Sequence, residues 1–410
     1  MSVTGSRSLP SYALFAAMLA SAGLPIYIHA PKFFVDSYGV GLGALGAVLF
    51  VLRLFDFVQD PALGWLAVRL RRARGVTVAV ALAAMALAMV GLFAVTPPVA
   101  PLLWFGITLT VLFSGFSFLT ITFYAQGVRK AEALGEKGHL RLAAWRETGA
   151  LLGVCLAAVA PTLLLGTGAP FAIFAGAFAA LALAAGLAMR REWVAADVPG
   201  EGGLRQVLGD PVARRLLLVA LVNATPVAVT STLFLFFVES RLAAPGWEGP
   251  LLLLFFLAAA LSAPAWGRAA RRFGAKPVLL TGMVLSVVAF GFAALLGPGD
   301  TAAFALICLA SGAALGADLT LLPAIFAARM ARIAPEAAQA FGLWSFVSKF
   351  TLAFAAVTLL PLLEASGFVS GGENPASALT MLTILYALVP CALKFLAIGL
   401  FALTTLNEES

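Results

Sequence analysis

The chain has 410 residues, of which 62% are hydrophobic and only 11% are charged. A soluble domain carries roughly 25% charged residues and cannot bury this much apolar surface, so the composition excludes a water-soluble globular protein. The net charge is +7, but the basic residues form short clusters between apolar runs, a pattern typical of membrane proteins rather than of nucleic-acid-binding surfaces. We therefore expect a lipid bilayer around the chain and no nucleic-acid partner.

Twelve apolar stretches are long enough to cross a bilayer, because a transmembrane helix needs about 20 residues. We interpret the first as an uncleaved helix rather than a signal peptide, since its apolar run continues beyond the small residues near Ala20. The helices are predicted near residues 10–33, 42–68, 76–96, 101–127, 143–166, 170–189, 212–238, 248–268, 277–297, 301–327, 340–366 and 377–404.

The distribution of Lys and Arg predicts the orientation of these helices. With the N-terminus inside, the basic clusters fall in cytoplasmic loops, and the opposite side holds only Lys32 and Arg241. Both termini are therefore expected in the cytoplasm, with the chain in the plasma (inner) membrane. The clusters lie at residues 69–74, 129–141, 190–215, 268–276 and 329–332.

The most polar stretch, residues 190–211, predicts a cytoplasmic linker between two six-helix bundles, 1–189 and 212–410. An internal repeat supports this division, because the Trp65 segment with its arginines returns at Trp266. Pro25 and Pro226 are related by the same interval. Two related halves with a binding site at their interface describe the major facilitator architecture, an all-α membrane fold.

Ionisable residues inside the second helix are the most informative feature of the sequence. Arg53, Asp56 and Asp60 share one helix face. Two carboxylates one turn apart repel each other in a low dielectric unless a cation or a proton lies with them. Gln59 can add a carbonyl oxygen, so the pattern predicts a site for Na⁺ or H⁺. The alternative is a structural network in which Arg53 pairs with Asp56 and Lys349 with Asp60.

Other charged residues inside predicted spans have different expected roles. Lys349 lies deep in its helix after Trp344 and Ser345 and needs an anion, either a helix-two carboxylate or an anionic substrate. Arg146 begins the fifth helix, where an interfacial ion pair with Glu147 is the simplest interpretation.

Two further charges are expected near the ends of their helices. Asp318 is expected to cap a loop or act in gating near the inner end of helix ten. Lys394 is expected to extend its ammonium group to the membrane surface. Polar residues of helices four and seven are candidates for lining a cavity: Tyr124, Gln126, Asn223 and Thr225.

The stretch Arg53-x-x-Asp56-x-x-x-Asp60-Pro61-x-x-Gly64-Trp65 resembles the helix-two signature of the glycoside–pentoside–hexuronide:cation symporters. This family is the melibiose permease-like branch of the major facilitator superfamily, which also contains sodium-dependent lysophospholipid carriers. Further matches are Tyr124, the run Ala144-Trp145-Arg146-Glu147, Trp266, the run Arg272-Phe273-Gly274, and Lys349.

The resemblance implies twelve helices in two pseudo-symmetric six-helix bundles. It also implies a cation held by Asp56 and Asp60, a link from Lys349 to the substrate site, and contact of Arg146 with sugar. Thr120 stands where the family has a helix-four carboxylate, and helix one contains no acid. The charged acceptors that a sugar's hydroxyl groups need are thus missing, which favours an amphipathic or weakly polar solute.

We expect cation-coupled symport, driven by Na⁺ or H⁺, of a sugar, a glycoside or a lysolipid-like solute by a monomer. The alternatives are a proton-driven exporter of drugs or metabolites and a non-transporting scaffold protein with the same fold. HExxH, GxSxG and Walker motifs are absent, so we expect neither an enzyme nor a cofactor other than the coupling ion. The candidate cation ligands are Asp56, Asp60, Gln59 and Thr120, and the candidate substrate or coupling residues are Lys349, Arg146, Tyr124, Arg53, Trp344, Ser345 and Asn223.

Overall fold

The computed structural model describes residues 9–193, 204–334, 337–369 and 372–405. Within these ranges the chain forms helices joined by short turns and no β-strand. It divides into two compact units, one formed by Met1–Gln206 with Met330–Phe346 and the other by Val207–Arg329 with Val347–Ser410. The predicted bundle boundaries stay predictions, because the linker at 190–211 contains residues 194–203, outside the described ranges.

The first unit contains six membrane crossings, and the first of these is broken. A helix from Leu9 to Ser21 (α2) is separated by Ala22 and Gly23 from a second helix, Leu24 to Tyr38 (α3). Pro25 lies in the first turn of α3, where a missing N–H is tolerated. The other crossings are α4 (Leu42–Arg69), α5 (Arg74–Phe93), α6 (Pro101–Ala133), α7 (Gly138–Leu163) and α8 (Pro170–Met189).

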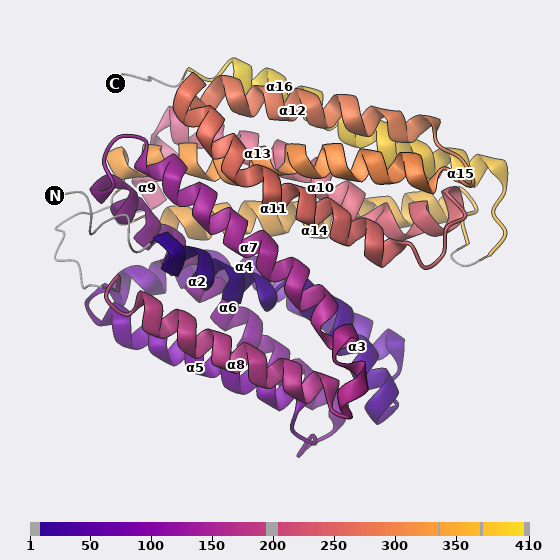
Figure 1. Ribbon diagram of the computed structural model, residues 1–410, viewed down its shortest axis with the longest axis horizontal. Helices are drawn as coiled ribbons and strands as arrows, with labels where there is room; N and C mark the ends of the chain where they lie inside the picture. Colours follow the sequence, from indigo (N-terminus) through magenta and orange to yellow (C-terminus); the bar gives the residue numbers. More distant parts are fainter. Residues whose placement is uncertain (1–8, 194–203, 335–336, 370–371, 406–410) are drawn as a thin grey trace. The chain divides into compact units, whose positions relative to one another are not determined.

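Glycines bring α2 and α7 into backbone contact. A Cβ atom added at Gly149 would lie 2.1 Å from the carbonyl oxygen of Ala13, and one added at Gly153 would lie 2.3 Å from that of Ala17. Small residues at four-residue spacing let membrane helices approach closely and gain dispersion energy. Elsewhere in this unit α5 packs along α6 and α8 (Figure 1).

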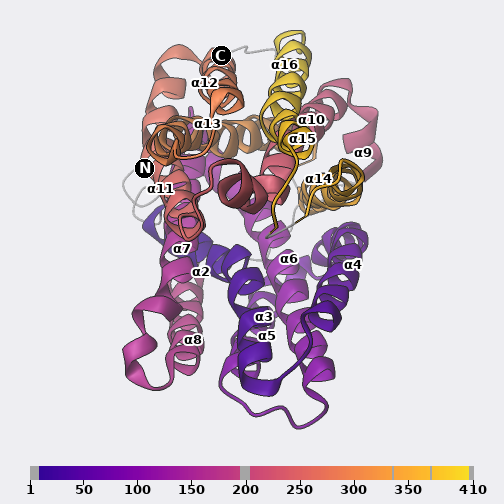
Figure 2. The ribbon, with the colours of Figure 1, turned by 90° about the vertical axis from the view of Figure 1, so that its right-hand side faces the viewer.

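The second unit contains the other six crossings. In it, α16 packs against α10 and α12, and α11 packs against α12 (Figure 2). Its core includes a stacked pair, Phe237 and Tyr386, with ring centres 4.1 Å apart. The helices are α10 (Pro211–Phe236), α11 (Glu248–Phe273), α12 (Ala275–Gly291), α13 (Thr301–Ile333), α14 (Ala338–Ala365, whose first residues belong to the first unit), α15 (Ala376–Thr383) and α16 (Val389–Ala402), and a short helix, α9 (Leu204–Gly209), precedes α10.

Two crossings of this unit contain a π-helical turn. Phe237–Arg241 ends the crossing begun by α10, and Ile384–Leu388 joins α15 to α16. The second turn ends two residues before Pro390, which cannot donate to the carbonyl one turn earlier, so the widened turn accommodates the missing hydrogen bond.

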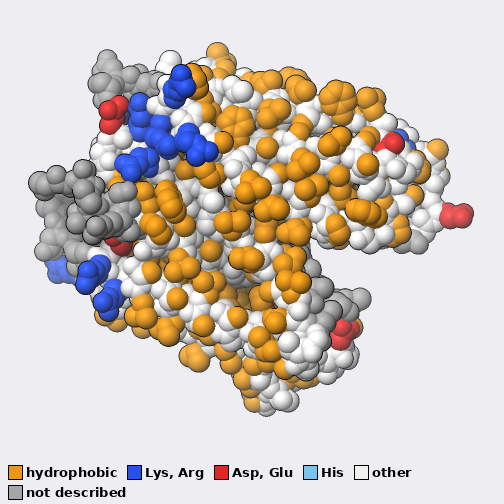
Figure 3. Space-filling model, viewed as in Figure 1, with side chains coloured by type: hydrophobic (Ala, Val, Ile, Leu, Met, Phe, Trp, Pro, Cys, Tyr) orange, Lys and Arg blue, Asp and Glu red, His pale blue; other side chains and the backbone are white. Residues whose placement is uncertain are grey.

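A helix forms at each of the twelve predicted crossings, which confirms the fold class. In the described part of the chain, nine helices are long and apolar enough to cross a membrane by themselves. One detail was wrong: Arg129, Lys130, Arg268 and Arg329 lie on helices, not in loops. A helix that leaves the hydrocarbon still satisfies its own backbone, so it continues into the polar region, where hydropathy no longer marks it. On the face drawn in Figure 3 the Lys and Arg side chains gather at one end of each unit.

Candidate functional site

The two acids of α4 are buried within the first unit. Asp56 and Asp60 are 4% and 0% exposed. They lie one helical turn apart, and the helix satisfies its own backbone groups, so their partners must be side chains or a bound ion.

Asp56 is linked to α6 through Gln59. The Gln59 Nε2 atom donates to Asp56 Oδ1 at 2.9 Å, and Ser114 Oγ donates to Gln59 Oε1 at 3.0 Å. In this arrangement the amide nitrogen of Gln59 faces Asp56, and its carbonyl oxygen faces Ser114. Rotation of the amide would exchange the two roles and present the oxygen as a ligand.

Asp60 accepts a hydrogen bond from the start of α14. Ser345 Oγ donates to Asp60 Oδ2 at 2.5 Å, and both residues belong to the first unit. The backbones of the two helices are in contact here, because a Cβ atom at Gly342 would lie 2.9 Å from the carbonyl oxygen of Asp60. The structure therefore brings the predicted Ser345 to Asp60, an association that the sequence did not specify.

The remaining predicted residues of this region are Thr120, Trp344, Lys349 and Arg53. Thr120 of α6 has a buried hydroxyl oxygen without a hydrogen-bond partner among the described residues. Trp344 and Lys349 are half-buried on α14. Lys349 belongs to the second unit, so its predicted pairing with Asp60 stays a prediction, and the side chain of Arg53 lies outside the described part of the chain.

Arg146 and Glu147 are buried and form a cluster with the half-buried Tyr124. Arg146 Nε lies 2.8 Å from Glu147 Oε1, and the guanidinium carbon lies 3.8 Å from the centre of the Tyr124 ring. The hydroxyl of Tyr124 donates to Glu147 Oε1 at 3.1 Å. The predicted ion pair is confirmed, but its position at the start of the helix was wrong, because α7 begins at Gly138. Arg146 Nη2 is buried without a hydrogen-bond partner among the described residues, which leaves one donor for a ligand.

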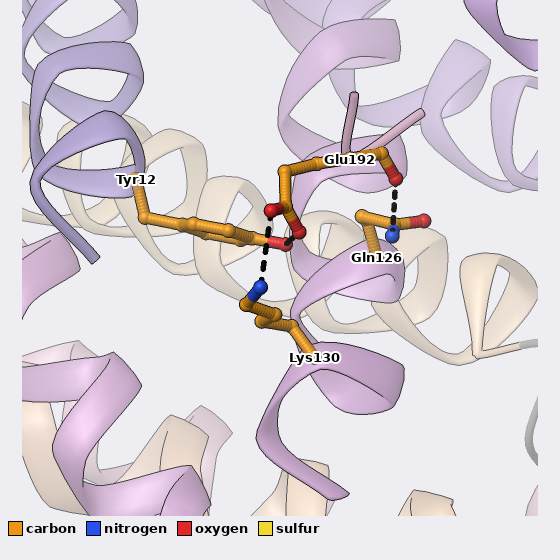
Figure 4. Close-up of polar contacts among 4 residues, drawn as sticks. All are labelled: Tyr12, Gln126, Lys130 and Glu192. Carbon is orange, nitrogen blue, oxygen red and sulfur yellow. Dashed lines mark hydrogen bonds and ion pairs between the residues drawn. The ribbon is translucent and has the colours of Figure 1, made fainter. Parts of the chain in front are cut away.

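A second polar network at the end of α8 was not predicted (Figure 4). Glu192 accepts from Tyr12 at 3.4 Å and from Lys130 at 3.0 Å, and its backbone oxygen accepts from Gln126 Nε2 at 2.6 Å. Gln126, a predicted cavity residue, lies in this network and also accepts from Arg74 at 3.1 Å. These residues come from α2, α5, α6 and the turn after α8, and they fasten the end of α8, a structural role that no local pattern indicates.

The second unit holds a buried ion pair that the sequence analysis misassigned. Lys394 of α16 is 4% exposed and pairs with Asp318 of α13, which is 6% exposed. Lys394 Nζ also donates to Asn223 Oδ1 of α10 at 2.6 Å. The expectation that Lys394 reaches the membrane surface was wrong, because it lies about 12 Å along the helix before Ala402, beyond the reach of a lysine side chain.

The predicted position of Asp318 was also wrong. Helix α13 continues to Ile333, so Asp318 lies near its middle rather than at the inner end. It therefore caps no loop, and its partner is a lysine within the same unit.

Comparison with known proteins finds similarity over nearly the whole chain. A family model described as MFS/sugar transport protein matches residues 10–408. Two solved structures with a similar fold cover 96% of this chain and are covered over 98% of their own: an outward-facing bacterial homologue of the iron transporter ferroportin (TM-score 0.70, 15% identity) and the fucose:proton symporter of E. coli (TM-score 0.65, 14% identity). At these identities the likeness concerns the fold, and no curated protein sequence gives a significant match.

Proposed function

This chain belongs to the MFS/sugar transport protein family, and from this premise we propose that it is a Na⁺- or H⁺-coupled symporter of a small solute. The solute is a sugar or glycoside, or an amphipathic compound of the lysolipid type, and it crosses the membrane by alternating access. The fucose:proton symporter with the same fold supports coupling of this kind.

The observation that carries the proposal is the pair of buried acids on α4. An ionised side chain in the middle of a bilayer costs about 2.5–3.5 kcal/mol on insertion scales, and two carboxylates one turn apart add mutual repulsion. A cation or proton that binds between them relieves both costs. Asp56 and Asp60 are both almost completely buried, which suits a site that binds and releases a mobile positive charge.

The proposed roles follow from the chemistry of each residue. Asp56 and Asp60 bind the ion, and the oxygens of Gln59, Thr120 and Ser345 supplement them as hard ligands. The unpartnered Nη2 of Arg146, above the ring of Tyr124, donates to the solute. Arg53, Trp344, Lys349 and Asn223 remain candidates for coupling or solute contact.

We further propose a monomer in the plasma (inner) membrane with both termini in the cytoplasm. The basic ends of the helices support this orientation, because cytoplasmic segments of membrane proteins are enriched in Lys and Arg. The partners are the bilayer and the solute, and no cofactor besides the coupling ion is needed.

Thermal unfolding of the purified protein tests the ion site without knowledge of the solute. An ion that binds the folded state alone raises the melting temperature by mass action. We expect NaCl, LiCl or acidification to stabilise the wild type relative to choline chloride at neutral pH. Asp56→Asn combined with Asp60→Asn should abolish this response.

Glu136→Gln is the matched control for these acids, because Glu136 belongs to the same unit and its side chain is 84% exposed. This variant should respond as the wild type does. A wild type that is insensitive to every cation and to pH, or a double variant with an unchanged response, would refute the ion site.

Transport direction and cellular function separate the two alternatives. Cation-stimulated uptake into right-side-out vesicles supports symport, whereas proton-driven efflux supports an exporter. A non-transporting scaffold predicts that the Asp56→Asn and Asp60→Asn variants keep their full cellular function.

A further inference from the structure

The buried pair of Asp318 and Lys394 lies beside a cavity inside the second unit. The cavity has a volume of about 70 Å³. Its wall includes both charged residues, the hydroxyl groups of Thr230, Ser286 and Ser311, and the rings of Phe255 and Phe290. A space that holds one water needs only about 10–15 Å³, so this cavity admits a larger polar group.

One carboxylate oxygen of Asp318 is unused. Asp318 Oδ2 is bound to Lys394, whereas Oδ1 is buried and has no hydrogen-bond partner among the described residues. The residue is 6% exposed, so bulk water does not compensate this oxygen. A buried charged oxygen without a donor is unfavourable, and a ligand that donates a hydrogen bond would remove that cost.

The charge balance of the site defines the class of ligand. A second cation at Asp318 would meet the ammonium group of Lys394, and an anion at Lys394 would meet the carboxylate of Asp318. Asn223 Oδ1 accepts a hydrogen bond from a second proton of the ammonium group, so the three side chains together carry no net charge. The suitable ligand is therefore uncharged and donates hydrogen bonds through hydroxyl groups.

We propose that the cavity around Asp318, Lys394 and Asn223 binds a hydroxylated edge of a small neutral polyol or monosaccharide. Asp318 Oδ1 accepts from one hydroxyl group, and the aromatic rings of Phe255 and Phe290 contact the apolar C–H face of the same molecule. This inference rests on the proposed function and identifies the solute class. It also supplies the carboxylate acceptor that helices one and four lack.

Local helix distortions lie near the site. The π-helical turn Ile384–Leu388 and Pro390 precede Lys394 on the same crossing, and Pro226 lies three residues after Asn223 on α10. Such turns shift the register of the side chains that follow and recur at binding sites. Lys394 lies within hydrogen-bond reach of Asp318 on α13 and of Asn223 on α10.

Isothermal titration calorimetry of the purified protein with xylose, galactose, glucose and myo-inositol tests the proposal. At least one of these compounds should bind the wild type. The double variant Asp318→Asn/Lys394→Gln keeps the site neutral, and its affinity should be weaker by roughly tenfold to a hundredfold, the loss expected for one hydrogen bond to a charged group.

Ser286→Leu provides a test that does not touch the ion pair. Ser286 lines the cavity and is bound only to its own helix, at Met283 O, so the larger side chain should fill the space and abolish binding. Thr320→Val is the matched control, because Thr320 is buried on α13 and is not part of the cavity wall. Its affinity should equal that of the wild type.

Three results would overturn the inference: no binding of any of the four compounds, equal binding by the wild type and the double variant, or unchanged binding by Ser286→Leu. The Na⁺ and pH response of the α4 acids is measured separately, so failure of this site is distinguishable from failure of the proposed symport. Binding of lysophosphatidylcholine alone would leave symport intact and contradict the polyol site.

Discussion

Lys394→Met should destabilise the second unit by about 3–5 kcal/mol, because removal of one partner leaves the other charge buried and unpaired. The side chains of Lys394 and Asp318 are only 4% and 7% exposed, so solvent screening reduces this cost little. Asn223 also loses its donor at 2.6 Å, which adds about 1 kcal/mol.

A double-mutant cycle in detergent measures this energy. Equilibrium unfolding is compared for the wild type, Lys394→Met, Asp318→Leu and the double variant, which places two apolar groups where the charges were. The double variant should recover most of the stability, because replacement of a buried pair by apolar residues is often nearly neutral. The reasoning is refuted if Lys394→Met unfolds like the wild type or if the two single effects simply add.

Contacts within each unit yield three other predictions. Gly149→Leu should cost at least 1–3 kcal/mol in thermal unfolding, roughly the penalty for overpacking, because its Cβ would collide with Ala13 O at 2.1 Å; Gly176→Ala, with no atom within 4 Å, should be neutral. Tyr124→Phe should cost about 1 kcal/mol in the same assay, since it removes only the 3.1 Å bond to Glu147, and a much larger loss would contradict this. Burial raises the pKa of Asp210, but hydrogen bonds from Arg329 and from Ala213 N hold this pKa below its usual 3.8. The carboxylate therefore stabilises the fold above pH 3.8, and this stability is lost as the pH falls through the lowered pKa. Asp210→Asn should remove this acid-dependent part of the change in melting temperature.

The helices were predictable because lipid imposes one strong rule. Every backbone N–H and C=O group in the hydrocarbon must be satisfied within the segment, so a run of about 20 apolar residues forms a helix almost regardless of its details. The break before Pro25 and the π-helical turn before Pro390 depend on single residues in their helical context. Apolarity alone does not locate them, because prolines are common in membrane helices.

The acids of the α4 site could be predicted from the sequence, but their partners on other helices could not. Asp56 and Asp60 share a face through helical spacing, which the sequence contains directly. Ser114 and Ser345 come from other helices, and only the packing of α4 against α6 and α14 shows that they hydrogen-bond to this site. Helix spacing is local information, whereas the choice of partner helix is not.

The ion pair of the second unit shows why distance from a helix end is an unreliable guide to a membrane charge. Lys394 was expected to extend its ammonium group to the membrane surface, and Asp318 was expected to cap a loop or act in gating near the inner end of its helix. Both expectations treat a helix as if lipid surrounded it. Inside a bundle the relevant question is which helix the side chain faces, and α16 presents Lys394 to Asp318 of α13 and Asn223 of α10. A lysine or an aspartate inside an apolar run costs free energy when it is buried in the membrane without a partner. A charged residue in such a run is therefore itself evidence for a residue of opposite charge elsewhere in the chain.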